Sequence, residues 1–217
     1  SRGQLKIMAN WAIVPVKNLD ISKSRLSDVL SVDARRELIC SLLVRTLSAL
    51  NESELIENTI VISNDKSVLQ LADNQEVMTV QEDSPYDLNS ALHQATLVTL
   101  THGATGLLVL PADLPLLTRE DVEKIVYEED SNRLVRIVPD QHGVGTNALF
   151  IRPPGMLRYK FGKDSLSNHK EEAKRVRAEL HVYRLSNVEF DIDDPDDIRR
   201  LNNVAVNTQQ QEVQRHG

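Results

Sequence analysis

The chain has little cysteine, no excess of positive charge and no long apolar run. Cys40 is the one cysteine among 217 residues, so a disulfide framework is excluded and a reducing cytoplasm is the expected location. It falls in a helical apolar pattern and lacks a local basic partner, so we expect a buried structural residue rather than a nucleophile. No segment approaches the roughly 20 apolar residues that span a bilayer, and a signal-peptide core is also missing. These absences predict a soluble, cytoplasmic protein.

The scarcity of positive charge excludes two classes of binding protein. Lysine and arginine number 25 against 32 acidic residues, which gives a formal net charge of -7 and an isoelectric point near 5.4. General nucleic-acid binders and proteins that bind anionic membranes both need a basic face. We therefore expect neither nucleic-acid nor membrane binding, and any anion site must be local.

The length suits one α/β domain with a continuous core. We expect that single domain to cover residues 8–203. Met8 would serve as a natural start, which makes residues 1–7 an expression remnant. Residues 204–217 are polar and rich in glutamine, so we expect a disordered tail there.

Apolar patterns along the chain alternate between those typical of strands and those typical of helices. We expect strands over residues 11–16, 59–63, 77–80, 106–110, 134–138, 146–151, 180–185 and 188–191. We expect helices over residues 34–50, 67–72, 88–100, 119–128, 166–178 and from 194 to the tail. This order predicts an α/β fold with a mostly parallel central sheet. The polar segment 17–31 is too long for a simple turn and is a candidate binding loop.

Asp113 follows the apolar run 106–110 and precedes a second apolar segment. In open α/β sheets, a carboxylate at the carboxyl end of a buried strand is well placed to hold a metal ion next to a phosphate. Thr118 and Asp121 have the spacing of a capping box for the next helix, so the Asp113 turn is held from both sides. We therefore predict that Asp113 is a magnesium ligand.

Asp191 and Asp193 alternate in a short segment that we expect to be a strand. Alternation directs both carboxylates to one face and Ile192 to the other. Two such carboxylates repel each other unless a cation neutralises them, so we expect them to join Asp113 around Mg²⁺. The alternative is that Asp193 and Asp194 only supply negative charge at the amino end of the last helix, and Asp194 fits that alternative better.

Three cations lie within nine residues of the loop after the first strand, namely Lys17, Lys23 and Arg25, with serines between them. Such a loop could wrap a triphosphate. It is neither a Walker loop nor a dinucleotide fingerprint, because the glycine spacing of both is missing. The alternative for three scattered cations is a solvated surface loop.

Two further turns could bind an anion, at residues 143–147 and 161–165. Exposed backbone amides and hydroxyls at a turn or a helix start are suited to anions. Either could equally be a tight turn without a ligand. His142 and His169 flank these turns and could contact the ligand, the alternative for each being a solvated side chain.

Seven motifs in order resemble the 2-phospho-L-lactate guanylyltransferase family of coenzyme F420 biosynthesis, over nearly all of residues 9–203. They lie at residues 14–17, 23–26, 87–92, 112–117, 145–149, 161–165 and 191–195. The resemblance implies a three-layer nucleotidyltransferase fold of the nucleotide-diphospho-sugar transferase type. It also implies a reaction in which a small phosphorylated carboxylic acid attacks the α-phosphorus of GTP and releases pyrophosphate. Family members act on 2-phospholactate, phosphoenolpyruvate or 3-phosphoglycerate.

The resemblance also implies roles for individual residues, with Mg²⁺ as the cofactor. It places GTP on Lys17, Lys23, Ser24, Arg25, Asn89 and Pro111, the phosphorylated acid on Thr146, Gly162 and Ser165, and the metal on Asp113, Asp191 and Asp193. Lys17, Lys23, Arg25 and Asp113 would be the catalytic residues. Asp87 replaces the family's usual glycine before Leu88 and Asn89, and could simply cap a helix. A homodimer is a further implication, and so is the hand-over of a labile product to the next enzyme of the F420 pathway.

Three other functions fit parts of the pattern. A molybdenum cofactor guanylyltransferase would share fold and metal but usually carries a glycine-rich loop after the first strand, which this chain lacks. A metal-dependent glycosyltransferase would place its Asp-x-Asp pair in the middle of the chain. A non-catalytic nucleotide-binding module would bind GTP without ever releasing pyrophosphate.

Overall fold

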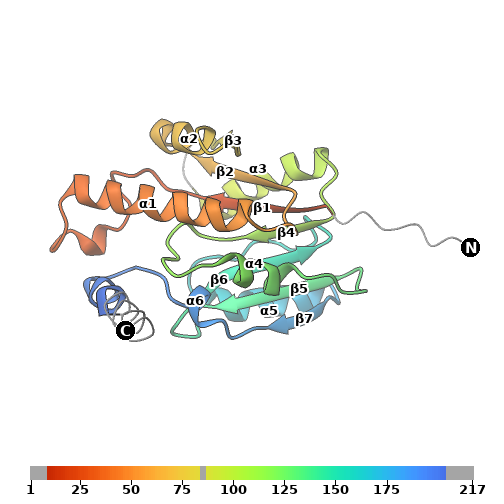
Figure 1. The fold of residues 1–217 in the computed structure, drawn as a ribbon. Coiled ribbons are helices and arrows are strands. Elements are labelled where there is room, and N and C mark those ends of the chain that lie inside the picture. The colour runs from red at the N-terminus through yellow and green to blue at the C-terminus, as the bar shows by residue number, and fades with distance from the viewer. Residues whose placement is uncertain (1–8, 84–86, 204–217) are drawn as a thin grey trace, which may run out of the picture.

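The computed structural model describes residues 9–83 and 87–203 (Figure 1). The expected expression remnant (residues 1–7) and the expected tail (residues 204–217) lie outside the described residues. No helix in the described part of the chain combines the length and apolar character needed to cross a bilayer.

A seven-stranded sheet forms the centre of the molecule, in the order β3-β2-β1-β4-β6-β5-β7. Its strands are β1 (Asn10–Pro15), β2 (Asn58–Ser63), β3 (Met78–Gln81), β4 (Gly106–Val109), β5 (Leu134–Pro139), β6 (Thr146–Arg152) and β7 (Glu179–Val182). Strand β6 runs antiparallel to both of its neighbours, and the other neighbouring pairs are parallel. The predicted α/β class with a mostly parallel sheet is confirmed.

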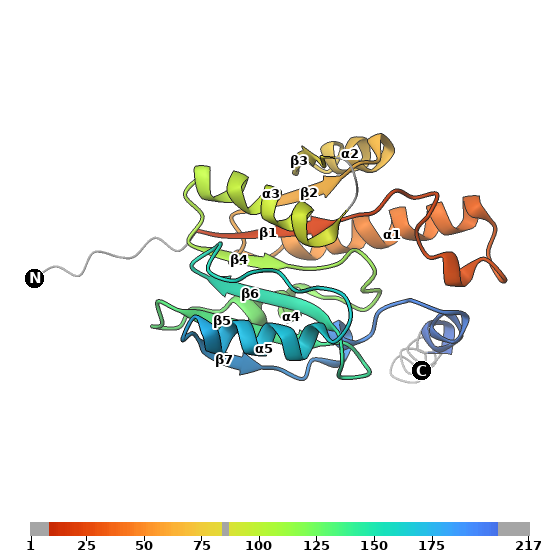
Figure 2. The same ribbon diagram turned by 180° about the vertical axis from the view of Figure 1, so that it is seen from behind.

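Helices cover both faces of the sheet, which gives three layers (Figures 1 and 2). They are α1 (Val32–Asn51), α2 (Lys66–Asp73), α3 (Leu88–Thr101), α4 (Arg119–Val126), α5 (Ser165–Arg175), α6 (Ser186–Glu189), the 3-10 turn η1 (Ser24–Leu26) and a helix over residues 195–203. Successive residues of β1 show why two layers form. Ala12 and Val14 pack in the core beneath α1, α2 and α4, whereas Trp11 and Ile13 pack in the core beneath α3 and α5.

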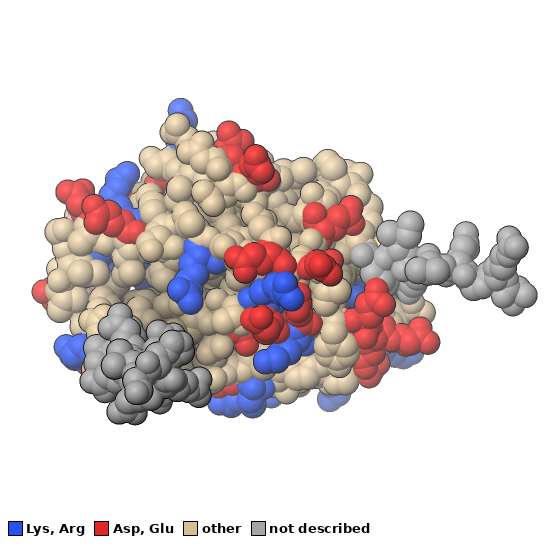
Figure 3. Space-filling view, in the orientation of Figure 1, with Lys and Arg blue, Asp and Glu red and all other residues tan. Residues whose placement is uncertain are grey.

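The charged surface agrees with the composition. On the described part of the face drawn in Figure 3, acidic and basic side chains are interspersed and form no continuous basic surface. This is the pattern of a solvated surface rather than of a face that binds a polyanion.

Two expectations about local structure are wrong. Residues 188–191 do not form a strand, because the single helical turn α6 occupies Ser186–Glu189 and the chain beyond it is extended without a strand ladder. Cys40 is half-buried and packs at the margin of the core rather than inside it. Burial raises the pKa of the Cys40 thiol, which keeps it protonated and a poor nucleophile at neutral pH.

Candidate active site

Three segments that are distant in sequence meet at the carboxyl-terminal edge of the parallel strands. They are the loop after β1, the loop after β4 and residues 190–193. In both views the loop after β1 and the segment leading into the helix 195–203 lie at the same end of the molecule (Figures 1 and 2). This is the edge at which open α/β sheets bind their ligands.

Asp113, Asp191 and Asp193 come together at this edge, with one carboxylate oxygen of each lying within 4.8 Å of the others. The backbone holds them in place, because the Ile192 amide donates a 3.2 Å hydrogen bond to the carbonyl oxygen of Asp113. Ile192 is fully buried, which turns its two neighbours to the opposite side. The alternation seen in the sequence therefore places both carboxylates on one face, although the segment is not a strand.

The start of the last helix fixes the position of Asp193. Asp194 is the N-cap, since its Oδ1 accepts from the Asp196 and Asp197 amides at 2.9 and 3.1 Å. The buried Asp197 carboxylate reaches back and accepts from the amides of Asp193 and Asp194 at 2.9 and 3.1 Å. The helix is thus capped by Asp194 and Asp197, which leaves the Asp193 side chain available to the site.

Lys23 lies among the carboxylates. Its ammonium group bonds to Oδ2 of Asp113 and, at 2.9 Å, to Oδ1 of Asp193. Burial alone would lower the pKa of Lys23, but the two carboxylates outweigh burial and raise it above its usual value. Burial would likewise raise the pKa of Asp193, yet the adjacent ammonium lowers it overall. Both groups are therefore charged at neutral pH.

The three carboxylates are not all paired with Lys23. Burial, together with the nearby Asp113 carboxylate, raises the pKa of Asp191 to about 6. Oδ1 of Asp113 is buried and has no hydrogen-bond partner among the described residues. One lysine does not neutralise three carboxylates, and an orphaned carboxylate oxygen is costly to bury. Oxygen donors arranged in this way could hold a hard divalent cation such as Mg²⁺.

The cationic loop forms the other wall of a cavity of about 350 Å³. Lys17, Lys23, Ser24 and Arg25 line this cavity, and Asp113 and Asp193 lie across from them. The loop is braced from below, because the Leu19 amide donates a 3.0 Å hydrogen bond to Asp65. The structure thus gathers the three predicted cations around one hollow that also contains carboxylates.

The two anion-binding turns predicted separately are neighbours. The Leu166 amide donates to the Val144 carbonyl oxygen at 3.0 Å, which joins them. Ser165, the first residue of α5, donates from Oγ to Oγ1 of Thr146 at 3.2 Å, and both residues are buried. Gly162 has φ +115°, which side chains rarely adopt, and a Cβ there would meet nothing within 4 Å. The three residues predicted to hold the phosphorylated acid thus belong to one pair of joined turns.

Asn89 and Asp87 have structural partners. The Asn89 side chain donates to the Phe161 carbonyl oxygen at 3.1 Å and accepts from the Phe161 amide at 2.9 Å, so it clamps the turn that carries Gly162. Asp87 caps α3 by accepting from the Ser90 amide at 2.9 Å, as the capping alternative predicted. Pro111 is half-buried on the loop that carries Asp113.

One contributing residue, Asn147, was assigned no role in the sequence analysis. Asn147 donates from Nδ2 to Asp191 Oδ1 at 3.2 Å and also to two backbone carbonyls of α6, which holds Asp191 in place. Its one sequence signal was its position directly after Thr146. His169 is fully buried against Thr146, whereas His142 is exposed.

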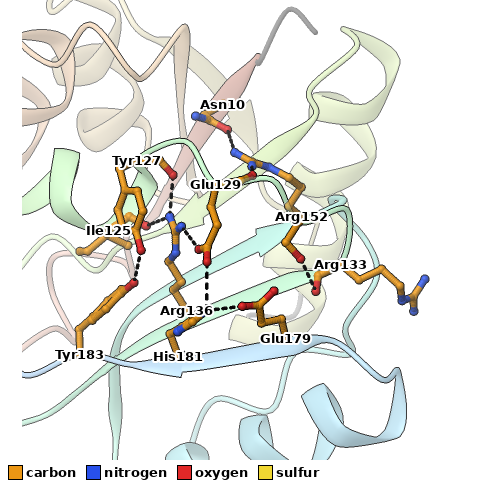
Figure 4. Close-up of polar contacts among 11 residues, drawn as sticks. Asn10, Ile125, Tyr127, Glu129, Arg133, Arg136, Arg152, Glu179, His181 and Tyr183 are labelled. Carbon is orange, nitrogen blue, oxygen red and sulfur yellow. Dashed lines mark hydrogen bonds and ion pairs between the residues drawn. The ribbon is translucent and has the colours of Figure 1, made fainter.

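A second group of acidic and histidine side chains, Glu129, Glu179 and His181, also lies close together. Glu129 joins this group to Arg136, whose side chain is fully buried. Figure 4 shows these contacts. Arg136 bonds through Nη2 to Glu129 at 2.6 Å, donates from Nη1 to two backbone carbonyls at 2.8 Å each, and lies 3.8 Å from the centre of the Tyr127 ring. The guanidinium supplies the positive charge that a metal would bring, so we assign this cluster a structural role.

Comparisons with known proteins agree with this geometry. A family model described as "Guanylyl transferase CofC like" matches residues 10–215. The chain is 38% identical to the phosphoenolpyruvate guanylyltransferase of Rubrobacter xylanophilus over 194 residues, which cover 89% of this chain and 94% of that one. It is 38% identical to the protein of the same name from a Roseiflexus species over 208 residues, covering 96% and 91%.

Solved structures show the same fold at low identity. A putative nucleotide-diphospho-sugar transferase from Desulfovibrio desulfuricans superposes with a TM-score of 0.66 at 17% identity, covering 82% of this chain and 80% of that one. A Methanothermobacter nucleotidyl transferase also gives 0.66, at 13% identity, covering 92% and 99%. The nucleotide-diphospho-sugar transferase-like fold is therefore confirmed.

Proposed function

The chain belongs to the CofC-like guanylyl transferase family and is a guanylyltransferase, and on that premise we propose that it joins GTP to phosphoenolpyruvate in coenzyme F420 biosynthesis. The observation that carries the proposal is the cavity lined by the three loop cations and by Asp113 and Asp193, whose carboxylates cluster with that of Asp191. Phosphoenolpyruvate is the acceptor that the names of the relatives give. We propose that residues 8–203 form one guanylyltransferase domain.

We propose that Asp113, Asp191 and Asp193 hold Mg²⁺. Oδ1 of Asp113 is buried with no partner in the described part of the chain, and the pKa of Asp191 is raised; both observations support a cation there. When bound, Mg²⁺ neutralises phosphate charge and favours attack at phosphorus. Asn147 keeps Asp191 directed into the site through its 3.2 Å hydrogen bond.

The basic loop is assigned to the phosphates of GTP. Lys17, Lys23 and Arg25 line the cavity and balance the charge that builds on the leaving pyrophosphate. Lys23 forms ion pairs with the carboxylates of Asp113 and Asp193. The phosphates of GTP would offer the same ammonium group other anionic partners. We therefore propose that Lys23 moves from the carboxylates to the phosphates when GTP binds. Pro111, Ser24 and Asn89 remain assigned to the nucleotide from the family resemblance.

The acceptor is assigned to the joined turns of Thr146, Gly162 and Ser165. Their hydroxyls and backbone hold the phosphate of the acid while one of its oxygens attacks the α-phosphorus of GTP. A new oxygen–phosphorus bond forms, the bond from the α-phosphorus to the bridging oxygen breaks, and pyrophosphate leaves. The attacking oxygen is already ionised at neutral pH, so no general base is needed and alignment supplies the rate.

Pyrophosphate release tests the proposal. Purified protein is supplied with GTP and Mg²⁺ and, in turn, phosphoenolpyruvate, 2-phospholactate and 3-phosphoglycerate, with the next pathway enzyme added to consume a labile product. We expect phosphoenolpyruvate to give the largest kcat/KM. We expect no pyrophosphate release with any acid once a chelator is added. A larger kcat/KM for another acid would identify that acid as the acceptor instead. Tight GTP binding without pyrophosphate release from any acid would indicate a nucleotide-binding module.

A further inference from the structure

His169 lies inside the protein between the two turns assigned to the acceptor. It is on α5 and its side chain is fully buried. Its Nδ1 is 3.1 Å from Oγ1 of Thr146, and its Nε2 is 3.0 Å from the backbone nitrogen of Lys160. One imidazole ring therefore contacts both turns.

The hydrogen bonds define which ring nitrogen carries the proton. A backbone amide can only donate, so Nε2 must accept from Lys160 and carries no hydrogen. Burial lowers the pKa of His169 to about 4, so the ring is neutral at physiological pH. A neutral ring has one proton, which then lies on Nδ1 and is shared between Thr146 Oγ1 and the backbone of Ser165 one turn earlier in α5.

The Thr146 hydroxyl consequently accepts two hydrogen bonds. Ser165 Oγ donates to Thr146 Oγ1 at 3.2 Å, and His169 Nδ1 donates to the same oxygen. A hydroxyl oxygen has two lone pairs and one proton. With both lone pairs occupied, Thr146 can meet a further group only as a donor, which suits an oxygen of a phosphate.

The same ring also holds the turn that carries Gly162. The Lys160 amide is fixed to Nε2, and the Phe161 ring meets the His169 ring edge-on with centroids 4.7 Å apart. Asn89 clamps the Phe161 backbone through two hydrogen bonds. Loss of the His169 contact to Thr146 or to Lys160 would let one turn shift against the other. A misplacement of about 1 Å in a positioned reactant can cost about 100-fold in rate.

We propose that His169 is a positioning residue for the acceptor, which sets the Thr146 hydroxyl as a donor toward the acceptor's phosphate and keeps the Gly162 turn in register. The inference rests on the proposed function, because it assumes that these turns hold the phosphorylated acid. It concerns the KM of the acceptor rather than the KM of GTP.

Two substitutions separate the two contacts of the ring. His169→Gln keeps an acceptor near the Nε2 position but removes the donor to Thr146, whereas His169→Asn keeps a donor near the Nδ1 position. For His169→Gln we expect the KM of the acceptor to rise about tenfold or more, as for loss of a hydrogen bond to a charged group, with the KM of GTP unchanged. For His169→Asn we expect a clearly smaller rise. Acceptor kinetics are measured with whichever acid the wild-type protein turns over.

A matched control and a double-mutant cycle distinguish positioning from stability. Tyr159→Phe removes a buried 2.6 Å hydrogen bond to Thr96 in the same part of the core without touching Thr146, and we expect neither KM to change. In a protein that already carries Thr146→Val, His169→Gln should raise the KM of the acceptor little further, because both changes remove the same hydrogen bond between Thr146 and His169.

The outcomes separate this inference from the proposed function. Normal acceptor kinetics in His169→Gln, equal rises in the KM of acceptor and GTP, or full additivity with Thr146→Val would each overturn the role of His169 while the wild type remains active. A wild-type protein that releases no pyrophosphate with any of the three acids would instead overturn the proposed function. Thermal unfolding of each variant shows whether it is folded at the assay temperature.

Discussion

Lys23 and Asp193, 170 residues apart in sequence, are joined by a 2.9 Å bond between Nζ and Oδ1. The same ammonium group bonds to Asp113, so Lys23 of the loop after β1 lies inside the carboxylate cluster. A divalent cation and Lys23 therefore require the same oxygens. On the proposed assignment of this loop to GTP, we expect the nucleotide to relieve the competition, because its phosphate oxygens would replace the carboxylates as partners of Lys23.

Replacement of Lys23 by methionine tests the competition. We expect Mn²⁺, used as a probe, to bind the nucleotide-free variant about tenfold more tightly, because one opposing charge has been removed at close range. The KM of GTP should rise while that of the acceptor changes little. Calorimetric titration with Mn²⁺ and initial-rate kinetics measure the two effects, with Lys124→Met, at an exposed position on α4, as the control. Weaker metal binding, or a rise confined to the acceptor, would reassign the loop.

Asp113→Asn should separate turnover from stability. We expect kcat to fall by about 100-fold or more, as for other losses of transition-state charge stabilisation. The free energy of unfolding should change by no more than about 1 kcal/mol, because the Asp113 side chain is 23% exposed and its ion pair is partly solvated. Stopped assays and urea unfolding measure the two quantities. Near-normal turnover at ordinary magnesium concentration would remove Asp113 from the metal site.

Asp191→Asn should stabilise the metal-free protein at neutral pH. The pKa of Asp191 is about 6 in the folded protein and 3.8 in the reference state, so the folded state binds its proton more tightly. Below pH 3.8, Asp191 therefore costs the wild-type protein no free energy of unfolding. The free energy of unfolding falls as the pH rises from 3.8, and the full loss is present above about pH 6.

The size of this penalty is on the order of 1 kcal/mol once partial solvent exposure is allowed for. Asparagine keeps the oxygen that accepts from Asn147 and removes the charge. In a chelating buffer, the melting temperature of the variant should exceed that of the wild type at pH 7 and match it near pH 4. A difference that is independent of pH, or of the opposite sign, would show that Asp191 is already neutralised.

Arg136→Lys should destabilise the protein without altering the chemistry. Lysine cannot reproduce the planar guanidinium that serves Glu129 and two backbone carbonyls, and a disrupted buried ion pair typically costs about 3 to 5 kcal/mol. Urea unfolding measures the loss, and KM values below the melting temperature should be unchanged. Glu179→Gln, at the edge of the same cluster, should cost much less. Loss of activity in folded Arg136→Lys would link this cluster to the active site.

The sequence predicts most of the fold because its helices and strands are locally encoded. The periodic apolar residues of α1 and the Thr118–Asp121 capping box depend on neighbours a few positions away, and both are present in the structure. The strand expected at 188–191 failed because alternation around Ile192 signals two faces but does not supply a partner strand.

The site is only partly readable from sequence, because its decisive contacts join distant segments. The residue types at Asp113 and Asp193 predict a cation, but the position of Lys23 between them depends on the convergence of three loops. A single histidine carries no local sign of burial, so the contacts of His169 with Thr146 and Lys160 were invisible. Asn89 likewise has a backbone partner 72 residues away.

Anomalous diffraction from crystals grown with Mn²⁺ and a non-hydrolysable GTP analogue tests the metal site most directly. We predict an anomalous peak within about 2.5 Å of oxygens from Asp113, Asp191 and Asp193, with the Lys23 ammonium moved away from them toward phosphate. A peak beside Glu129, Glu179 and His181 instead, or an unchanged Lys23 bonded to Asp113 and Asp193 with the nucleotide in place, would contradict the proposed metal site.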